Sequence, residues 1–293
     1  MGTLLAASLA RAGHAVTLLD RDPERAARTS ARPLELTTPT GETWSVPVQV
    51  ALSVPPEVEV AFLCVKTGAT EAALAPVRDL SCTVAILQNG CERASFVAEA
   101  LGLGERVVGI STTEGATRSG EGRVHHTGAG SSQVGPARPE GAERAERVVA
   151  LLKSAGFAAQ IGDVRAASWR KLVVNAAINA LTGLLDCPNG QLLASPAAAE
   201  LADSAAREVA EVALALGVSG NWEPEAACAA WREVALHTSV NISSTLQDLR
   251  RGQTTEVHAI NGAVARLAAE SGLAAPTNSL LCRLVAAREE LAV

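Results

Sequence analysis

The stretch MGTLLAASLARAGHAVTLLDRD, residues 1–22, decides the fold of the first half of the chain. Apolar residues recur in it at helical spacing as far as a break at Gly13, and a short apolar run at 15–19 then ends in Asp20 and Arg21. A helix, a glycine and a strand that ends in polar residues are typical of the second half of a βαβ unit that binds a dinucleotide.

Candidate cofactor ligands stand at both ends of this stretch. Gly2 takes the place of the third glycine of a G-x-G-x-x-G loop, where the absence of a side chain lets the helix pack closely on the strand. At the end of the second strand an acid binds the ribose 2′-hydroxyl of NAD, and an arginine binds the 2′-phosphate of NADP. Because Asp20 and Arg21 are both present, NAD, NADP and a plain turn before a helix capped by Asp22 all remain open.

The first strand and the first two glycines of such a unit would precede Met1. That strand is central in the strand order 3-2-1-4-5-6, and a domain without its roughly 5–6 buried apolar residues would lose about 10 kcal/mol. Because whole domains are stable by only about 5–15 kcal/mol, we expect low stability and weak cofactor binding from this chain alone. A translation start further upstream is the simplest explanation.

Composition narrows the class of protein. The 293 residues are enough for two domains, and 48% of them are apolar. A net charge of −6 and an aromatic content of 2% argue against nucleic acid and anionic membranes as partners. No apolar run is long enough for a membrane span, and no secretory signal is visible. Six irregularly spaced cysteines, none in a C-x-x-C pair, indicate reduced thiols of a cytoplasmic protein rather than a metal site.

The hydrophobic pattern changes once along the chain. In the first half short apolar runs, expected as strands at 58–65, 83–87 and 106–111, alternate with helical segments. This alternation predicts an α/β Rossmann-type domain with a doubly wound parallel sheet in residues 1–163. Residues 164–293 carry helix patterns almost throughout, which predicts an all-helical second domain.

Polar residues follow two successive predicted strands. Lys66 follows one of them, and Gln88-Asn89-Gly90 ends the next. Ligands of open α/β sheets bind at the carboxyl ends of the strands, so we expect Lys66 and Asn89 near a ligand. Ordinary turns use the same residue types, which makes each signal weak by itself.

The segment WRKLVVNAAIN at 169–179 carries the strongest chemical signal. Lys171, Asn175 and Asn179 are spaced four residues apart and form one polar stripe on an otherwise apolar helix. Asparagine is a mediocre helix former, so two of them in one stripe favour the wall of a cleft. A lysine there, with its pKa lowered by loss of solvent, is suited to donate a proton, and the asparagines are suited to hold a hydroxyl or carboxylate. An exposed amphipathic face is the alternative.

Glu256 is a candidate only in combination with another residue. It is predicted in the first turn of a helix at 255–271, where the helix dipole favours an acid in any protein. A structural role is therefore the simpler explanation, unless Glu256 meets Lys171 in the folded chain.

Taken together, these segments resemble the ketopantoate reductase (2-dehydropantoate 2-reductase) family. The similarity covers nearly the whole chain and includes LARAGHAVTLLDR, FLCVKT, LQNG, GISTTEGA, WRKLVVNAAINALTGLL, CPNGQL, SSTLQDLRRGQTTEVHAINGAV and PTN. The resemblance implies a Rossmann domain and a helical domain with the active site between them. It also implies reduction of 2-dehydropantoate to (R)-pantoate with NADPH, in the synthesis of pantothenate and coenzyme A.

The resemblance further assigns roles to individual residues. Lys171 corresponds to the general acid of the family, and Glu256 to a conserved acid near the lysine and the substrate hydroxyl. The implied substrate ligands are Asn175, Asn179, Asn189 and Ser244, with Ser244 on the carboxylate, and the implied cofactor-site residues are Gly2, Arg21, Lys66, Asn89 and Ala116. Hydride would pass from the nicotinamide to the keto carbon while Lys171 protonates the alkoxide, without a metal.

Two other functions remain open. A related enzyme of the same superfamily would reduce a different 2-oxoacid. A chain without the first strand would be a non-catalytic remnant that binds a small acid or a partner without cofactor. The sequence also leaves open whether the protein forms a homodimer.

Overall fold

The structure is a computed structural model, and it describes residues 1–291 of the chain. The chain divides into two compact units. The α/β unit consists of Met1–Gln88 and Arg93–Val164, and the helical unit consists of Asn89–Glu92 and the chain from Arg165 onward. A Rossmann-type first half and an all-helical second half agree with the fold class predicted from the sequence.

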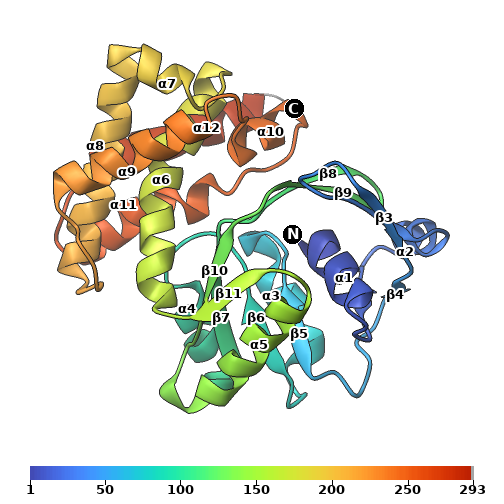
Figure 1. The fold of residues 1–293 in the computed structure, drawn as a ribbon. Helices are drawn as coiled ribbons and strands as arrows, with labels where there is room; N and C mark the ends of the chain where they lie inside the picture. Colours follow the sequence, from blue (N-terminus) through green and yellow to red (C-terminus); the bar gives the residue numbers. More distant parts are fainter. Residues whose placement is uncertain (292–293) are drawn as a thin grey trace. The chain divides into compact units, whose positions relative to one another are not determined.

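The main sheet of the α/β unit has five strands in the order β11-β10-β7-β6-β5 (Figure 1). They are β5 (Val60–Leu63), β6 (Thr83–Ile86), β7 (Val107–Thr112), β10 (Ser131–Pro136) and β11 (Ala158–Ile161). Neighbours are parallel except β7 and β10, which pair antiparallel. The sheet is thus mixed rather than wholly parallel as predicted, because the chain returns from β7 to β10 through a β-hairpin and not through a crossover helix.

Helices cover both faces of this sheet. Successive residues of a strand point to opposite faces, so Val84 and Ile86 of β6 enter one apolar core while Ala85 between them enters the other. The first core contains α3 and α4, and the second contains α1 and α5. The bounds are α1 (Gly2–Arg11), α3 (Thr70–Leu74), α4 (Arg93–Ala100) and α5 (Ala142–Ser154).

A second, four-stranded sheet packs on α1 in the order β3-β2-β9-β8. Its strands are β2 (Leu34–Thr37), β3 (Thr43–Val46), β8 (Gly115–Gly120) and β9 (Arg123–Gly128). Two short strands, β1 (Thr17–Leu19) and β4 (Gln49–Ala51), pair with each other in parallel. Within residues 1–291 no strand pairs with the outer edge of β5, and Val60 and Phe62 of that strand therefore stay partly exposed.

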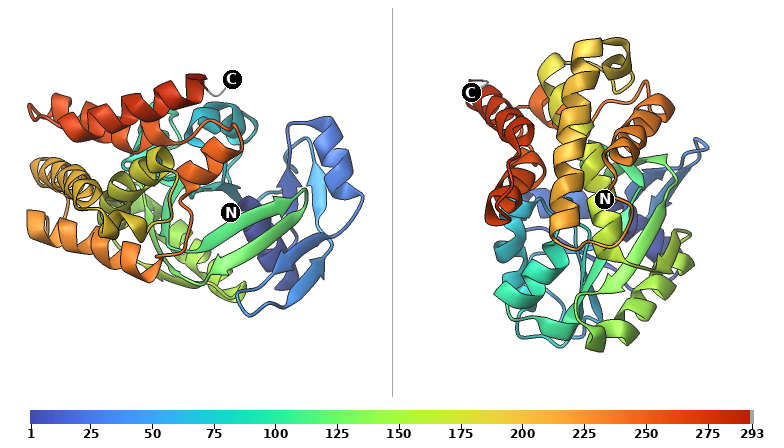
Figure 2. Two further views of the ribbon diagram at one scale, coloured as in Figure 1. Left: turned by 90° about the horizontal axis from the view of Figure 1, so that it is seen from above. Right: turned by 90° about the vertical axis from the view of Figure 1, so that its left-hand side faces the viewer.

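Helix α6 (Val164–Leu185) is the centre of the helical unit (Figure 2). Every residue from 176 to 183 is buried, because neighbouring helices contact this part of α6 on several sides. The other helices are α7 (Gln191–Ala194), α8 (Pro196–Ala215), α9 (Pro224–His237), α10 (Ser244–Arg250), α11 (Asn261–Glu270) and α12 (Pro276–Leu291). No helix within residues 1–291 is long and apolar enough to cross a membrane.

A buried polar network ties three of these helices together. Glu208 of α8 accepts hydrogen bonds from the backbone N–H groups of Thr277 and Asn278, at 2.8 and 2.9 Å, in the first turn of α12. The amide of Asn278 also contacts Glu208 at 2.8 Å, and its oxygen accepts from Asn261 of α11 at 2.9 Å. The carboxylate thus satisfies N–H groups that the start of a helix leaves without partners.

Candidate functional site

The polar stripe of α6 is not an exposed face. Lys171 and Asn175 are partly buried and Asn179 is buried, which excludes the alternative of an ordinary amphipathic surface helix. Burial lowers the pKa of Lys171 below its ordinary value of 10.5, while the negative charge of Glu256 raises it and opposes that effect. The stripe therefore combines a lysine suited to proton transfer with two amide side chains.

The two asparagines of the stripe have hydrogen-bonding capacity to spare. Asn179 is only 8% exposed, yet its side chain makes no hydrogen bond within residues 1–291, and neither does that of Asn175. Buried amide groups in proteins are normally hydrogen-bonded. Two amides without partners on one helix face, next to a lysine, indicate a place for a polar ligand.

Glu256 is held by a residue from far away in the sequence. Asn89 Nδ2 donates a hydrogen bond of 2.8 Å to Glu256 Oε2, and both side chains are partly buried. The negative charge of Glu256 raises the pKa of Lys171, which supports a role of Glu256 beside the lysine, and that role stays a prediction. Asn89, predicted near a ligand at the end of β6, thus contacts the candidate acid directly.

The local structure around Glu256 differs from the prediction. Glu256 precedes a short 3-10 turn, η5 (Val257–Ala259), and α11 begins only at Asn261. Ile260 between them has φ −104° and ψ −92°, which is not helical. The single helix predicted at 255–271 is therefore two elements, and Glu256 lies outside both.

Ser244 begins α10, and its position follows from how α10 docks on α6. The hydroxyl groups of Ser243 and Thr182 lie 2.7 Å apart and form a buried hydrogen bond between the two helices. A Cβ at Gly183 would be 2.8 Å from Thr245 Cγ2, so glycine is needed for this close approach. Ser244 is exposed, and its side chain has no hydrogen-bond partner within residues 1–291.

Asn189 combines a structural bond with a free acceptor. Its Nδ2 donates to Thr238 Oγ1 at 2.9 Å, which ties the loop after α6 to the end of α9. Its Oδ1 is buried and has no partner in the described structure. Its predicted contact with substrate stays a prediction.

In the α/β unit, Asp20 and Arg21 at the end of β1 differ in whether their side chains are already bound by a neighbour. Arg25, on α2 (Pro23–Ser30), donates two hydrogen bonds of 2.5 Å to the carboxylate of Asp20. These bonds lower the pKa of Asp20. Arg21 is exposed, and its guanidinium makes no ion pair or hydrogen bond within residues 1–291. Only Arg21 is therefore free to bind a ligand without breaking an existing contact.

The remaining predicted cofactor residues also lie in the α/β unit. Gly2 starts α1, and a Cβ there would be 3.4 Å from the Cβ of Cys64, a close but ordinary contact. Lys66 is exposed after β5, and Ala116 is partly buried on β8. Their roles toward a cofactor stay predictions.

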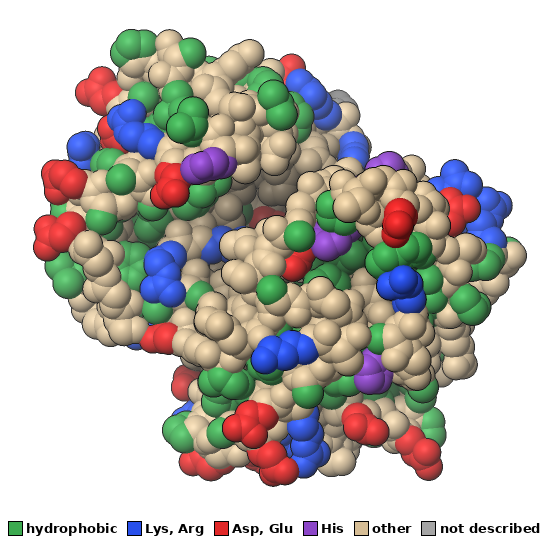
Figure 3. Space-filling model, viewed as in Figure 1, with side chains coloured by type: hydrophobic (Ala, Val, Ile, Leu, Met, Phe, Trp, Pro, Cys, Tyr) green, Lys and Arg blue, Asp and Glu red, His purple; other side chains and the backbone are tan. Residues whose placement is uncertain are grey.

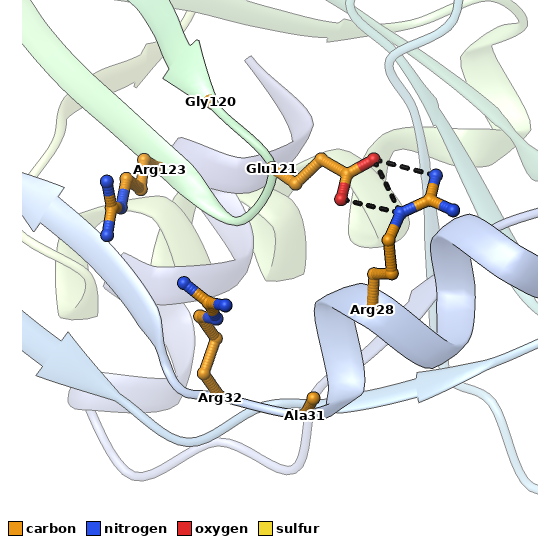
Figure 4. A pocket seen from close by; sticks show the side chains of 6 residues that line it. All are labelled: Arg28, Ala31, Arg32, Gly120, Glu121 and Arg123. Atoms are coloured by element: carbon orange, nitrogen blue, oxygen red, sulfur yellow. Dashed lines mark hydrogen bonds and ion pairs between the residues drawn. The ribbon is translucent and has the colours of Figure 1, made fainter.

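A cavity of about 320 Å³ lies between the end of α2 and the β8–β9 turn. Figure 4 shows Arg28 paired with Glu121 on one side of it, and Arg32 and Arg123 on the other. Arg123 is itself paired with Glu35 at 2.8 Å. None of the predicted site residues lines this cavity, whose arginines are largely neutralised by carboxylates.

Charged side chains and cysteines outside the stripe are spread over the molecule. On the face shown in Figure 3, basic and acidic side chains are interspersed rather than gathered by charge. No group of three or more His, Cys, Asp or Glu side chains within residues 1–291 is arranged to hold a metal ion. The six cysteines, all of them described, are free thiols.

A Rossmann-type unit joined to a helical unit that holds a lysine near a carboxylate points to an oxidoreductase as the class of protein. Comparisons with known proteins give the particular family. The profile described as Ketopantoate reductase PanE/ApbA matches residues 1–139, and its C-terminal counterpart matches residues 163–289. The chain belongs to the ketopantoate reductase family, and it is an oxidoreductase of the group that acts on CH–OH.

Individual relatives agree with this assignment. A 2-dehydropantoate 2-reductase of Halobacterium salinarum is 34% identical over 291 residues, which cover 97% of this chain and 94% of the relative. The crystal structure of a PanE/ApbA family ketopantoate reductase from Ralstonia eutropha has a TM-score of 0.85 at 28% identity, covering 98% of this chain and 95% of that one. D-mandelate dehydrogenase, solved with NADH and anilino(oxo)acetate, shares the fold with a TM-score of 0.89 at 24% identity, covering 98% and 95% of the two chains.

Proposed function

We propose that this protein reduces 2-dehydropantoate to (R)-pantoate with NADPH, a step in the synthesis of pantothenate and coenzyme A. The observation that carries the proposal is the stripe on α6, where a lysine with a lowered pKa lies in the field of Glu256 and near two amides without partners. A keto acid needs both parts of this arrangement, because its carbonyl must be protonated during reduction and its polar groups must be held.

The side chains divide these tasks. Lys171, in its ammonium form, donates a hydrogen bond to the keto oxygen, stabilises the charge that develops there and transfers the proton. Glu256 favours the ammonium form that this role requires. The substrate hydroxyl and carboxylate are assigned to Asn175, Asn179 and Ser244, with Asn189 as a further ligand.

The residues of the α/β unit fit a phosphorylated dinucleotide. Arg21 has an unpaired guanidinium, whose planar N–H groups match phosphate oxygens, whereas Asp20 is already bound by Arg25. This favours NADPH over NADH. When bound, NADPH supplies the hydride. Gly2, Lys66 and Ala116 of this unit, together with Asn89 of the helical unit, complete the set that we assign to its binding.

The setting of the reaction follows from the cysteines. Six free thiols are stable in a reducing compartment, so we place the protein in the cytoplasm. Its ligand is a small 2-oxoacid. Light scattering measures whether two chains associate as a homodimer.

The test is an initial-rate assay that follows the oxidation of NADPH with 2-dehydropantoate and with a panel of other 2-oxoacids. We expect the highest kcat/KM for 2-dehydropantoate, and a higher value with NADPH than with NADH. A higher kcat/KM for another 2-oxoacid would replace the substrate but keep the reaction. Binding of 2-dehydropantoate without turnover of any 2-oxoacid would instead support the non-catalytic alternative.

A further inference from the structure

Four residues, Asn89–Glu92, are packed with the helical unit although the chain on both sides of them belongs to the α/β unit. We call this segment the strap. It follows β6 and precedes α4, and the sequence predicts only a turn here. The contacts of the strap reach α6, the helix that carries Lys171, at one end and Glu256 at the other.

One end of the strap is fastened to α6 by Glu92. Its Oε1 accepts hydrogen bonds from Arg165 Nε at 2.7 Å and from Trp169 Nε1 at 3.0 Å. Trp169 is fully buried and lies two residues before Lys171 on the same helix. A single carboxylate thus links the strap to the helix that carries the general acid.

The other end of the strap lies against η5, the turn that directly follows Glu256. Gly90 has φ +98°, and a Cβ there would be 2.8 Å from the carbonyl oxygen of Ala259, in η5. Glycine is therefore required both by the backbone conformation and by the close approach. At this end Asn89 donates its 2.8 Å hydrogen bond to Glu256.

The backbone conformation of Glu92 is unfavourable for a glutamate, which indicates that its side chain has a specific role. Its φ is +57°, in the left-handed region that favours glycine and is costly for a residue with a long side chain. A glutamate here is opposed by its own conformation, so its two hydrogen bonds to α6 are what hold it in place. Residues in such conformations are over-represented where the position of a group matters.

We propose that Glu92 is a positioning residue: by fastening the strap to α6 it holds Asn89 so that the Asn89 amide keeps the carboxylate of Glu256 beside Lys171. This inference rests on the function proposed above for Lys171 and Glu256. The contacts form a continuous chain from α6 through Glu92 and Asn89 to Glu256. When the link at Glu92 is cut, Asn89 loses its fixed place, and with it Glu256 loses its orientation.

The test is a double-mutant cycle between Glu92 and Asn89 in the full chain. Glu92→Gly keeps the left-handed backbone and removes the carboxylate, whereas Glu92→Gln keeps an acceptor oxygen for Trp169 and Arg165. We expect Glu92→Gly and Asn89→Ala each to lower kcat roughly 10-fold with little change in KM for 2-dehydropantoate at saturating NADPH, and Glu92→Gln to stay within about 3-fold of the wild type. The double variant should be no slower than Asn89→Ala alone. If the two losses multiply, Glu92 does not act through Asn89 and the proposal is overturned.

A second readout does not depend on turnover. The chain has three lysines, Lys66, Lys153 and Lys171, so each is resolvable by NMR after 13C-methylation. Because Glu256 raises the pKa of Lys171, release of Glu256 in Glu92→Gly should lower that pKa. Arg165→Gln changes an exposed residue and leaves the hydrogen bond from Trp169 to Glu92 in place, so it should lower the pKa of Lys171 less. An unchanged pKa of Lys171 in both variants overturns the proposal. Absence of turnover in the wild type would contradict the proposed function alone, since the titration still measures the positioning.

Discussion

Asn89 donates a 2.8 Å hydrogen bond to Glu256, and the two residues are 167 positions apart in the sequence. The first was predicted near a ligand at the end of a strand, and the second was best explained as an ordinary acid at a helix start. Their contact, and the effect of Glu256 on Lys171, connect two weak signals with the strong signal of the Lys171 stripe in one candidate site.

Removal of the lysine should abolish most of the reductase activity. We expect Lys171→Ala to lower kcat with 2-dehydropantoate by roughly 10²–10⁴-fold, because the alkoxide loses its proton donor, while KM changes much less. Lys153→Ala, at an exposed lysine on α5, is the matched control and should leave the rate unchanged. Equal rates for Lys171→Ala and the wild type would remove Lys171 from the mechanism.

The pH dependence of the rate should report the environment of Lys171. Its ammonium form is the proton donor, so kcat/KM falls as pH rises through its pKa, which burial places below 10.5. Glu256 raises that pKa, so Glu256→Gln should move the alkaline limb of the pH–rate profile to lower pH. A shift to higher pH would show that Glu256 does not act on the lysine as a negative charge.

Discrimination between NADPH and NADH should depend on Arg21. Loss of its guanidinium in Arg21→Ala removes donors to a 2′-phosphate, so KM for NADPH should rise roughly 10- to 100-fold while KM for NADH stays within about 2-fold. Arg32→Ala serves as control, because Arg32 is also exposed but lines the separate cavity. If both cofactors are affected equally, the 2′-phosphate is bound elsewhere.

The buried charge of Lys171 should lower the free energy of unfolding at neutral pH. Burial lowers the pKa of Lys171 in the folded chain below 10.5, its value in the unfolded chain. At pH values between the two, the unfolded chain binds more protons than the folded chain. The free energy of unfolding therefore rises with pH in this range. At pH values below the pKa of Lys171 in the folded chain, the lysine is charged in both states, and the destabilisation by its buried charge is complete. Lys171→Met should therefore unfold at a higher Tm than the wild type at pH 7, by roughly 2–4 °C for each kcal/mol gained, and the difference should shrink as pH approaches 10.5. A lower Tm for Lys171→Met at pH 7 would contradict this.

The network at the start of α12 should be a main determinant of stability in the helical unit. Glu208→Ala leaves the part-buried N–H group of Thr277 and the buried N–H group of Asn278 without acceptors, so we expect the free energy of unfolding in urea to fall by about 3 kcal/mol. Glu211→Ala changes an exposed glutamate of the same helix and should cost less than about 0.5 kcal/mol. Similar losses for the two variants would show that the network is not needed.

Much of the fold could be predicted because helices and strands depend on the spacing of apolar residues that are close in the sequence. The helix at α6 and the strands β5, β6 and β7 follow from apolar spacing, and the observed bounds differ from the predicted ones by a few residues. The direction of β10 could not be predicted, since it depends on the hairpin that precedes it and on its pairing with β7. The break at Ile260 is not predicted, because no proline is near it and the neighbouring glycine, Gly262, lies inside α11 rather than at the break.

The sequence by itself determined the family, the Rossmann-type and helical halves, and the polar stripe of Lys171, Asn175 and Asn179, because each of these is a pattern between near neighbours or a set of shared motifs. Only the tertiary structure decided that the stripe is partly to fully buried, that Asp20 is bound by Arg25 while Arg21 is free, and that Asn89 donates a hydrogen bond to Glu256. The physical reason is that burial and hydrogen bonding depend on side chains brought together from distant parts of the chain, and local spacing does not specify which of them meet.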